Sequence, residues 1–298
     1  MNNSDSFTSV EDEIDFKGLF TYLWKSKFIV AATSLIFALV GVFYSLSLDN
    51  IYRSEALLAP AESNQPNSPL LSQFGAAAGL IGFNLPDASG DVVATAIATL
   101  QSREFIRRFI DSHSLKPALL AGYYDGESGS LQIDSSIYDA EADTWVGEMP
   151  TDQDAFRVFH RILSISENRT NGLITVAIEW IDPTQARDWV AWLIEDINAL
   201  IKQQDLSEAN EALEYLRKQL ESTQLVEMQR AFYQLIESQT RIVMLADVRE
   251  DYVFKIIDPP VAPQERLSPN RTLISLVAFS LGAILSVIGL LLVRSTKL

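Results

Sequence analysis

The chain of 298 residues contains no cysteine and only two histidines, His113 and His160. The absence of cysteine excludes disulfides and thiolate metal sites. Each histidine lies on a predicted helix among apolar neighbours, a pattern that favours a structural role over that of a ligand or base. The sequence therefore predicts no metal site.

The motifs of common catalytic sites are also absent. There is no G-x-x-x-x-G-K-[ST] phosphate loop, no G-x-S-x-G nucleophile turn and no H-E-x-x-H metal helix. Carboxylates are numerous, so composition alone leaves a paired-carboxylate glycosidase site open. However, Glu208, Glu211, Glu214 and Glu221 lie on the charged side of a long predicted helix, as solvated residues do. We expect no catalytic residue, no bound cofactor and no enzymatic activity.

Positive charge is scarce, with 23 Lys and Arg against 39 Asp and Glu and a net charge of −16. The deficit lies in residues 49–272, which hold 18 Lys and Arg and 34 Asp and Glu. An acidic surface of this kind argues against nucleic acid or anionic lipid head groups as partners.

Two runs of 21 residues, 28–48 and 273–293, contain no charged side chain. As helices they would be about 32 Å long at ~1.5 Å per residue, which matches the ~30 Å hydrocarbon core of a bilayer. Ser45 and Ser47 offer a weak signal-peptidase site, but the long acidic leader favours a retained membrane helix. Lys25 and Lys27 precede the first run and Asp49 follows it, so both termini are predicted to be cytoplasmic, although Arg271 weakens the contrast.

The segment between the two runs mixes strand and helix patterns. Residues 51–59 predict a strand, residues 91–113 a helix with Asp91 as its N-cap, and residues 152–162 a second helix. Residues 163–168 and 173–181 predict a β-hairpin around Thr170, Asn171 and Gly172. Three further segments are a polar loop, a Gly/Ala-rich apolar stretch too short to span a membrane, and an unassigned region: residues 63–69, 74–85 and 120–151.

The longest periodic segment follows Asp182-Pro183, an N-cap followed by a first-turn proline. A slip near Ser222-Thr223 leaves two interpretations, one long helix or a helical hairpin. A narrow apolar stripe with seven-residue spacing is a candidate oligomer contact: Leu206, Ala209, Leu213, Leu216 and Leu220.

A predicted strand at 252–258 leads into four prolines that precede the second apolar run: Pro259, Pro260, Pro263 and Pro269. Prolines at this density favour a stiff, extended backbone, in contrast to a flexible linker. Small residues at helical spacing form a candidate packing face on the two membrane helices: Ser34, Ala38, Gly41, Ala278, Gly282 and Ser286.

Three stretches together resemble one known family. The first is Asp12-Glu13-Ile14-Asp15-Phe16 with Leu19, Leu23-Trp24 and Lys25, and the second is Ile51-Tyr52-Arg53-Ser54-Glu55-Ala56. The most specific is the proline motif, Ile257-Asp258-Pro259-Pro260-Val261-Ala262-Pro263 through Leu267-Ser268-Pro269-Asn270-Arg271. The order of these features resembles the Wzz-type polysaccharide co-polymerases, the chain-length determinants of O-antigen (lipopolysaccharide), capsule and exopolysaccharide synthesis.

The resemblance implies an α+β fold with a membrane-proximal base and a long helical arm, in a homo-oligomer of the bacterial inner membrane. It implies a Wzy-type polymerase as partner, the growing glycan as a further candidate partner, and no catalytic centre. A Walker-loop tyrosine kinase, present in some relatives, is absent from this sequence. The expected organisation is a leader, a membrane helix, the base, the arm, a returning strand with the proline segment, a second membrane helix and a tail: 1–27, 28–48, 49–183, 184–247, 248–272, 273–293 and 294–298.

Other functions compete with this interpretation. A two-pass periplasmic sensor or binding module would need an output domain, which the short tail 294–298 cannot supply. An export adaptor would usually have one membrane helix, and an external carbohydrate hydrolase would need a catalytic motif.

Overall fold

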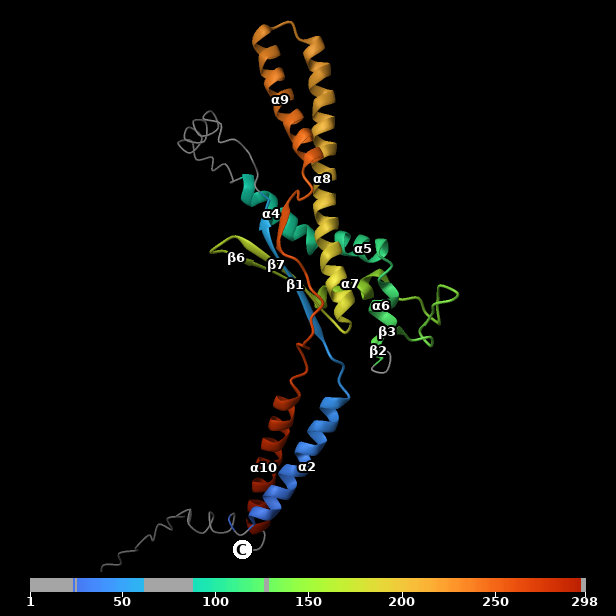
Figure 1. Ribbon diagram of the computed structural model, residues 1–298, viewed down its shortest axis with the longest axis vertical. Coiled ribbons are helices and arrows are strands. Elements are labelled where there is room, and N and C mark those ends of the chain that lie inside the picture. The colour runs from blue at the N-terminus through green and yellow to red at the C-terminus, as the bar shows by residue number, and fades with distance from the viewer. Residues whose placement is uncertain (1–23, 25, 62–87, 126–128, 296–298) are drawn as a thin grey trace, which may run out of the picture. The chain divides into compact units, whose positions relative to one another are not determined.

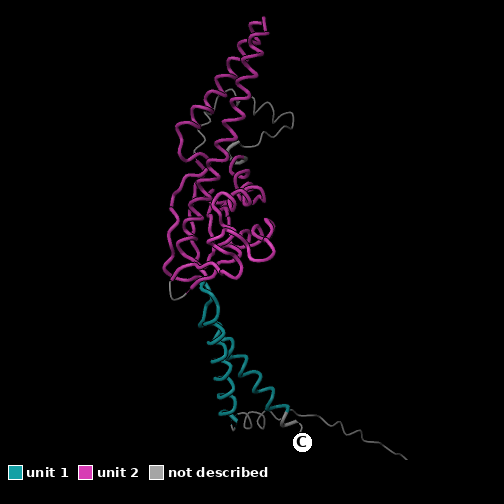
Figure 2. Tube along the Cα trace, turned by 90° about the vertical axis from the view of Figure 1, so that its right-hand side faces the viewer, with its two compact units in different colours: residues 1–50, 268–298 teal, residues 51–267 magenta. Residues whose placement is uncertain are grey.

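The computed structural model describes residues 24, 26–61, 88–125 and 129–295. The chain forms two compact units, one made of residues 1–50 and 268–298 and the other of residues 51–267 (Figure 2). The predicted segments 63–69 and 74–85 lie outside the described residues.

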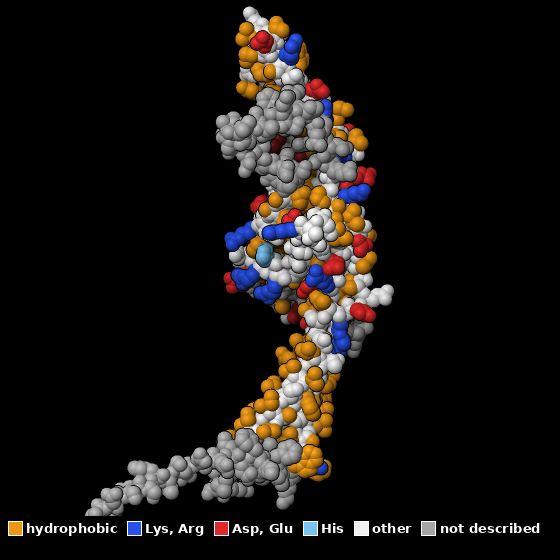
Figure 3. Space-filling view, turned by 90° about the vertical axis from the view of Figure 1, so that its left-hand side faces the viewer, with side chains coloured by type: hydrophobic (Ala, Val, Ile, Leu, Met, Phe, Trp, Pro, Cys, Tyr) orange, Lys and Arg blue, Asp and Glu red, His pale blue; other side chains and the backbone are white. Residues whose placement is uncertain are grey.

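The first unit contains helices α2 (Lys27–Leu46) and α10 (Arg271–Ser295), which pack antiparallel along each other (Figure 1). Both are long and apolar enough to cross a membrane. Most of their apolar side chains point outward, and the space-filling view shows hydrophobic side chains along the outside of the two helices (Figure 3). A soluble protein would bury such a surface, whereas lipid accepts it.

A four-stranded antiparallel sheet with strand order β6-β7-β1-β8 forms the centre of the second unit. Its strands are β1 (Tyr52–Pro60), β6 (Leu163–Asn168), β7 (Leu173–Trp180) and β8 (Phe254–Asp258). The predicted hairpin is present as β6 and β7, and its turn places Gly172 at φ +68°, which favours glycine. Ala56 pairs with Val176 across β1 and β7, and both side chains are buried.

Helix α8 (Pro183–Ser222) covers one face of this sheet with the first half of its length (Figure 1). Trp189 packs against Trp180 with ring centroids 5.0 Å apart. Asp182 caps the helix as predicted, because its Oδ1 accepts hydrogen bonds from the backbone N–H groups of Thr184 and Gln185. The core shared by α8 and the sheet includes large, fully buried side chains: Leu58, Ile174, Ile178, Trp189, Leu193 and Ile197.

The helix predicted at 91–113 is two helices, α4 (Ala88–Leu100) and α5 (Arg103–Ser112). The prediction of Asp91 as N-cap was wrong, since Asp91 lies inside α4. The chain breaks at Gln101-Ser102, where the Ser102 hydroxyl accepts a hydrogen bond from the backbone N–H of Phe105 and caps α5. Helices α6 (Lys116–Ala121) and α7 (Asp152–Ile162) pack beside α5.

The unassigned region 120–151 contains two small hairpins. Strand β2 (Gly122–Asp125) pairs with β3 (Ser130–Ile133), and β4 (Tyr138–Asp139) pairs with β5 (Thr144–Trp145). The backbone N–H of Leu131 donates to Asp182 Oδ2, which ties β3 to the start of α8. Strands this short give too little alternation to be predicted from sequence.

The second half of α8 forms a hairpin-like arm with α9 (Val226–Val248) (Figure 1). The helices are separated at 223–225, which decides between the two interpretations left open by the sequence. The predicted α+β fold, with an apolar helix at each end and a long helical arm, is confirmed.

Candidate assembly surfaces

The two glycines of the predicted packing face lie where α2 and α10 approach most closely. A Cβ added to Gly41 would lie 2.6 Å from Ala278 Cβ, and one added to Gly282 would lie 2.7 Å from Phe37 Cβ. Real Cβ atoms do not approach so closely, so both positions require glycine at this helix separation. The two helices of one chain therefore use this face against each other.

The other predicted members of the face surround these two contacts. Ser34 is buried and donates a hydrogen bond to Val30 O, whereas Ala38, Ala278 and Ser286 are half-buried. Contact of this face with another protein stays a prediction.

The proline segment runs antiparallel beside the first residues of β1 (Figure 1). Strand β8 leaves the β1 edge at Pro259, after which Ser54 Oγ donates to Val261 O at 2.9 Å. The backbone N–H of Leu267 then donates to Ile51 O at 2.8 Å. Of the four predicted prolines, Pro259 is exposed and the others are half-buried: Pro260, Pro263 and Pro269. The segment thus continues along the sheet edge without a regular ladder, because proline has no backbone donor.

The apolar stripe predicted on the long helix lies on the part of α8 that α9 accompanies. Ala209, Leu213 and Leu216 are buried, and Leu206 and Leu220 are half-buried. Ala246 is the fully buried residue of α9. Much of the stripe is therefore covered within the chain, and its role as an oligomer contact stays a prediction.

The arm nevertheless presents other apolar side chains to its surroundings. On α9 and just before it, large apolar residues are exposed by 45% or more: Leu225, Val226, Met228, Tyr233, Leu235, Met244 and Val248. A helix with apolar residues outside its internal contact favours packing against another protein surface.

Two polar contacts hold the returning chain against α8. Asn198 is buried, and its Oδ1 accepts hydrogen bonds from the backbone N–H groups of Val253 and Phe254, both at 2.9 Å. Its Nδ2 donates to Phe254 O at 2.9 Å. The Tyr252 hydroxyl donates to Asp205 Oδ2 at 2.6 Å, and burial together with this bond raises the pKa of Tyr252. These contacts fix where the arm ends and β8 begins.

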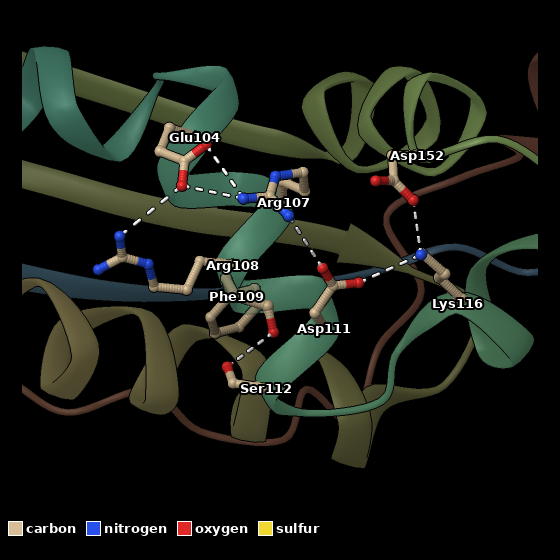
Figure 4. A network of polar contacts seen from close by, with 8 residues as sticks. All are labelled: Glu104, Arg107, Arg108, Phe109, Asp111, Ser112, Lys116 and Asp152. Carbon is tan, nitrogen blue, oxygen red and sulfur yellow. Dashed lines mark hydrogen bonds and ion pairs between the residues drawn. The ribbon is translucent and has the colours of Figure 1, made fainter.

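A network of charged side chains joins α5, α6 and α7 on the surface (Figure 4). Lys116 Nζ lies 2.6 Å from Asp152 Oδ1 and 3.2 Å from Asp111 Oδ1. Its hydrogen bond lowers the pKa of Asp152, and the same bond raises the pKa of Lys116. Arg107 bridges Glu104 and Asp111 along α5. The network links the three helices to one another.

The two histidines occupy structural positions in the described part of the chain. The ring of His113 stacks on Trp192 with centroids 4.5 Å apart, and its Nε2 lies 3.0 Å from Asp196 Oδ2. His160 is exposed beside Phe156. Among the described residues, no group of three or more His, Asp or Glu side chains could hold a metal ion.

The sequence was compared with models of known protein families. Residues 12–113 match the family model Wzz, described as chain length determinant protein. This match covers about a third of the chain and agrees with the resemblance noted in the sequence.

Two solved structures are similar to this chain. A full-length bacterial polysaccharide co-polymerase has 12% sequence identity and a TM-score of 0.49, with 95% of this chain and 98% of that chain covered. A fragment of WzzB, a polysaccharide co-polymerase from Salmonella Typhimurium, has 16% identity and a TM-score of 0.30, with 74% of this chain and 100% of that chain covered. A search of curated proteins gives no match.

Proposed function

We propose that this protein is an oligomeric scaffold of the bacterial inner membrane that regulates the length of a surface polysaccharide made by a Wzy-type polymerase. Both termini are cytoplasmic and residues 49–272 are periplasmic in this proposal. The polymerase performs the chemistry, and this chain supplies an assembly surface without a catalytic centre.

The observation that carries the proposal is the Wzz match over residues 12–113, which includes the first apolar helix and β1. Two apolar helices at the ends of the chain support a membrane location. The exposed apolar residues of α9 support assembly with further copies, because an isolated arm would leave them in water.

Deletion of the gene tests the proposal. In the deletion strain, surface polysaccharide resolved on a gel should lose its modal length while polymer synthesis continues. Expression of the intact chain should restore the mode. Complete loss of polymer would contradict the proposal and indicate an enzyme or an exporter, and an unchanged length distribution would contradict it equally.

A further inference from the structure

A groove runs between α8 and the junction of α4 with α5. Its volume is about 470 Å³, within the range of about 300–1,000 Å³ that small-ligand sites occupy. It lies near Leu200, at the part of α8 where the helix extends beyond the sheet and the arm begins. On another side of the same turns, Lys202 and Asp205 hold the returning chain.

The groove has an apolar floor and polar walls. Phe105 and Leu200 contribute the apolar side, and the carboxamides of Gln203 and Gln204 project from α8. Neither carboxamide makes a hydrogen bond to any residue that the structure describes. The hydroxyl of Ser207 extends this wall by one turn.

This lining selects against several classes of ligand. Among the described residues that line the groove, the charged ones are Arg108 and Glu104, whose Nη2 and Oε1 atoms lie 3.7 Å apart, so this cation is already accompanied by an anion. A phosphate or carboxylate ligand would lack a free cation there. No group of metal-binding side chains exists in the described chain, which gives a metal ion no ligand set.

Carboxamides match one class of ligand well. Each presents two N–H donors and one carbonyl acceptor, and a sugar hydroxyl is likewise both donor and acceptor. The C–H faces of a sugar ring can lie against an apolar floor. Small-molecule sites generally combine such a floor with a few convergent polar groups.

We propose that this groove binds a short stretch of uncharged sugar residues of the polysaccharide, with Gln203 and Gln204 hydrogen-bonding its hydroxyls. This inference rests on the proposed function for the identity of the glycan. Binding here places the glycan against the α8 turns that connect the base to the arm.

The test measures binding to the full-length protein in detergent by isothermal titration calorimetry. The probe is the host's own surface polysaccharide, cleaved from its lipid and fractionated to short oligosaccharides. Wild-type protein should bind it, and the Gln203→Ala/Gln204→Ala double variant should bind at least about tenfold more weakly, since two hydrogen bonds are lost. Gln234→Ala, an exposed glutamine of α9 outside the groove, is the matched control and should bind as wild type.

Absence of binding to the wild-type protein, or equal affinity of the double variant, would overturn the inference. Because both glutamines are exposed on a helix and alanine is a good helix former, the double variant should keep the wild-type thermal midpoint. The failure of the proposed function appears separately, as an unchanged length distribution in the deletion strain. If the polysaccharide of the deletion strain loses its modal length while the purified protein binds no oligosaccharide, only the proposed glycan binding in the groove is refuted.

Discussion

Asn198 joins α8 to the chain that returns from the arm. Replacing it with alanine leaves two buried N–H groups and one buried carbonyl of Val253 and Phe254 without a partner. At about 1–3 kcal/mol for each unsatisfied group, Asn198→Ala should destabilise the protein by at least about 3 kcal/mol. Urea unfolding of the full chain in detergent measures this loss.

Asn210→Ala is the control, because Asn210 is exposed on the same helix. It should change stability by no more than about 0.5 kcal/mol. Equal unfolding midpoints for the two variants would refute the role assigned to Asn198.

Lys116 gives the contact between α5, α6 and α7 a defined pH dependence. The lowered pKa of Asp152 contributes stability above the usual aspartate value, and this stability is lost as pH falls through the folded-state value. The raised pKa of Lys116 contributes stability that is lost only as pH rises through its own folded-state value. The stabilisation should therefore be present from about pH 4 to about pH 10.

Lys116→Met should lower the thermal midpoint between about pH 5 and about pH 9, and the difference from wild type should shrink as the pH falls below the usual aspartate pKa. The effect should stay below about 1 kcal/mol, because Asp152 is 53% exposed and water screens the pair. Lys255→Met, an exposed lysine without an ion pair among the described residues, should show no such profile. A pH-independent difference for Lys116→Met would contradict the assignment.

At the scale of the element, the pairing of α2 with α10 can be tested because the chain has no cysteine of its own. Gly41 lies so close to Ala278 that a Gly41→Cys/Ala278→Cys variant should form a disulfide within one chain once the helices move apart by about 1 Å, because the Cβ atoms of a disulfide lie about 3.5–4.5 Å apart. Adding Gly282→Leu should reduce this cross-link severalfold, because the new side chain meets Phe37 and Ser34. Mass spectrometry of the digested protein measures the cross-linked fraction.

Gly289→Leu is the matched control, since a Cβ at Gly289 meets nothing within 4 Å. It should leave the cross-link at its original level. Equal cross-linking with Leu at either position would show that the helices do not pack as described.

Sequence patterns predicted those elements whose signals are local. Alternation and Asn171-Gly172 predicted the β6–β7 hairpin, and Asp182-Pro183 predicted the start of α8. The break at Ser102 was missed, because apolar periodicity continues across it without glycine or proline.

Local sequence patterns could not predict the contacts between segments that are distant in the sequence. Asn198 looks like any polar residue of a charged helix until Phe254, far along the chain, is placed against it. Small residues marked the faces of α2 and α10, but the sequence did not show that the faces meet each other. The groove beside Gln204 likewise needs the α4–α5 break and α8 side by side.

At the scale of the whole molecule, the proposed topology predicts which positions an impermeant reagent can reach. Asn210→Cys should react with a membrane-impermeant maleimide once the outer membrane is opened, because residues 49–272 are periplasmic in the proposal. Thr296→Cys should react only after the inner membrane is also broken. Labelling of Thr296→Cys from outside would refute cytoplasmic termini.

The hydrogen bond between Leu267 and Ile51 brings the two ends of the second unit together, at an N···O distance of 2.8 Å. A folded region whose entry and exit touch behaves as a cassette, since it can be cut out or inserted without stretching its host. Exchange of residues 51–267 between relatives would leave no gap to bridge. A single recombination event would thereby place a different second unit between the same two terminal helices.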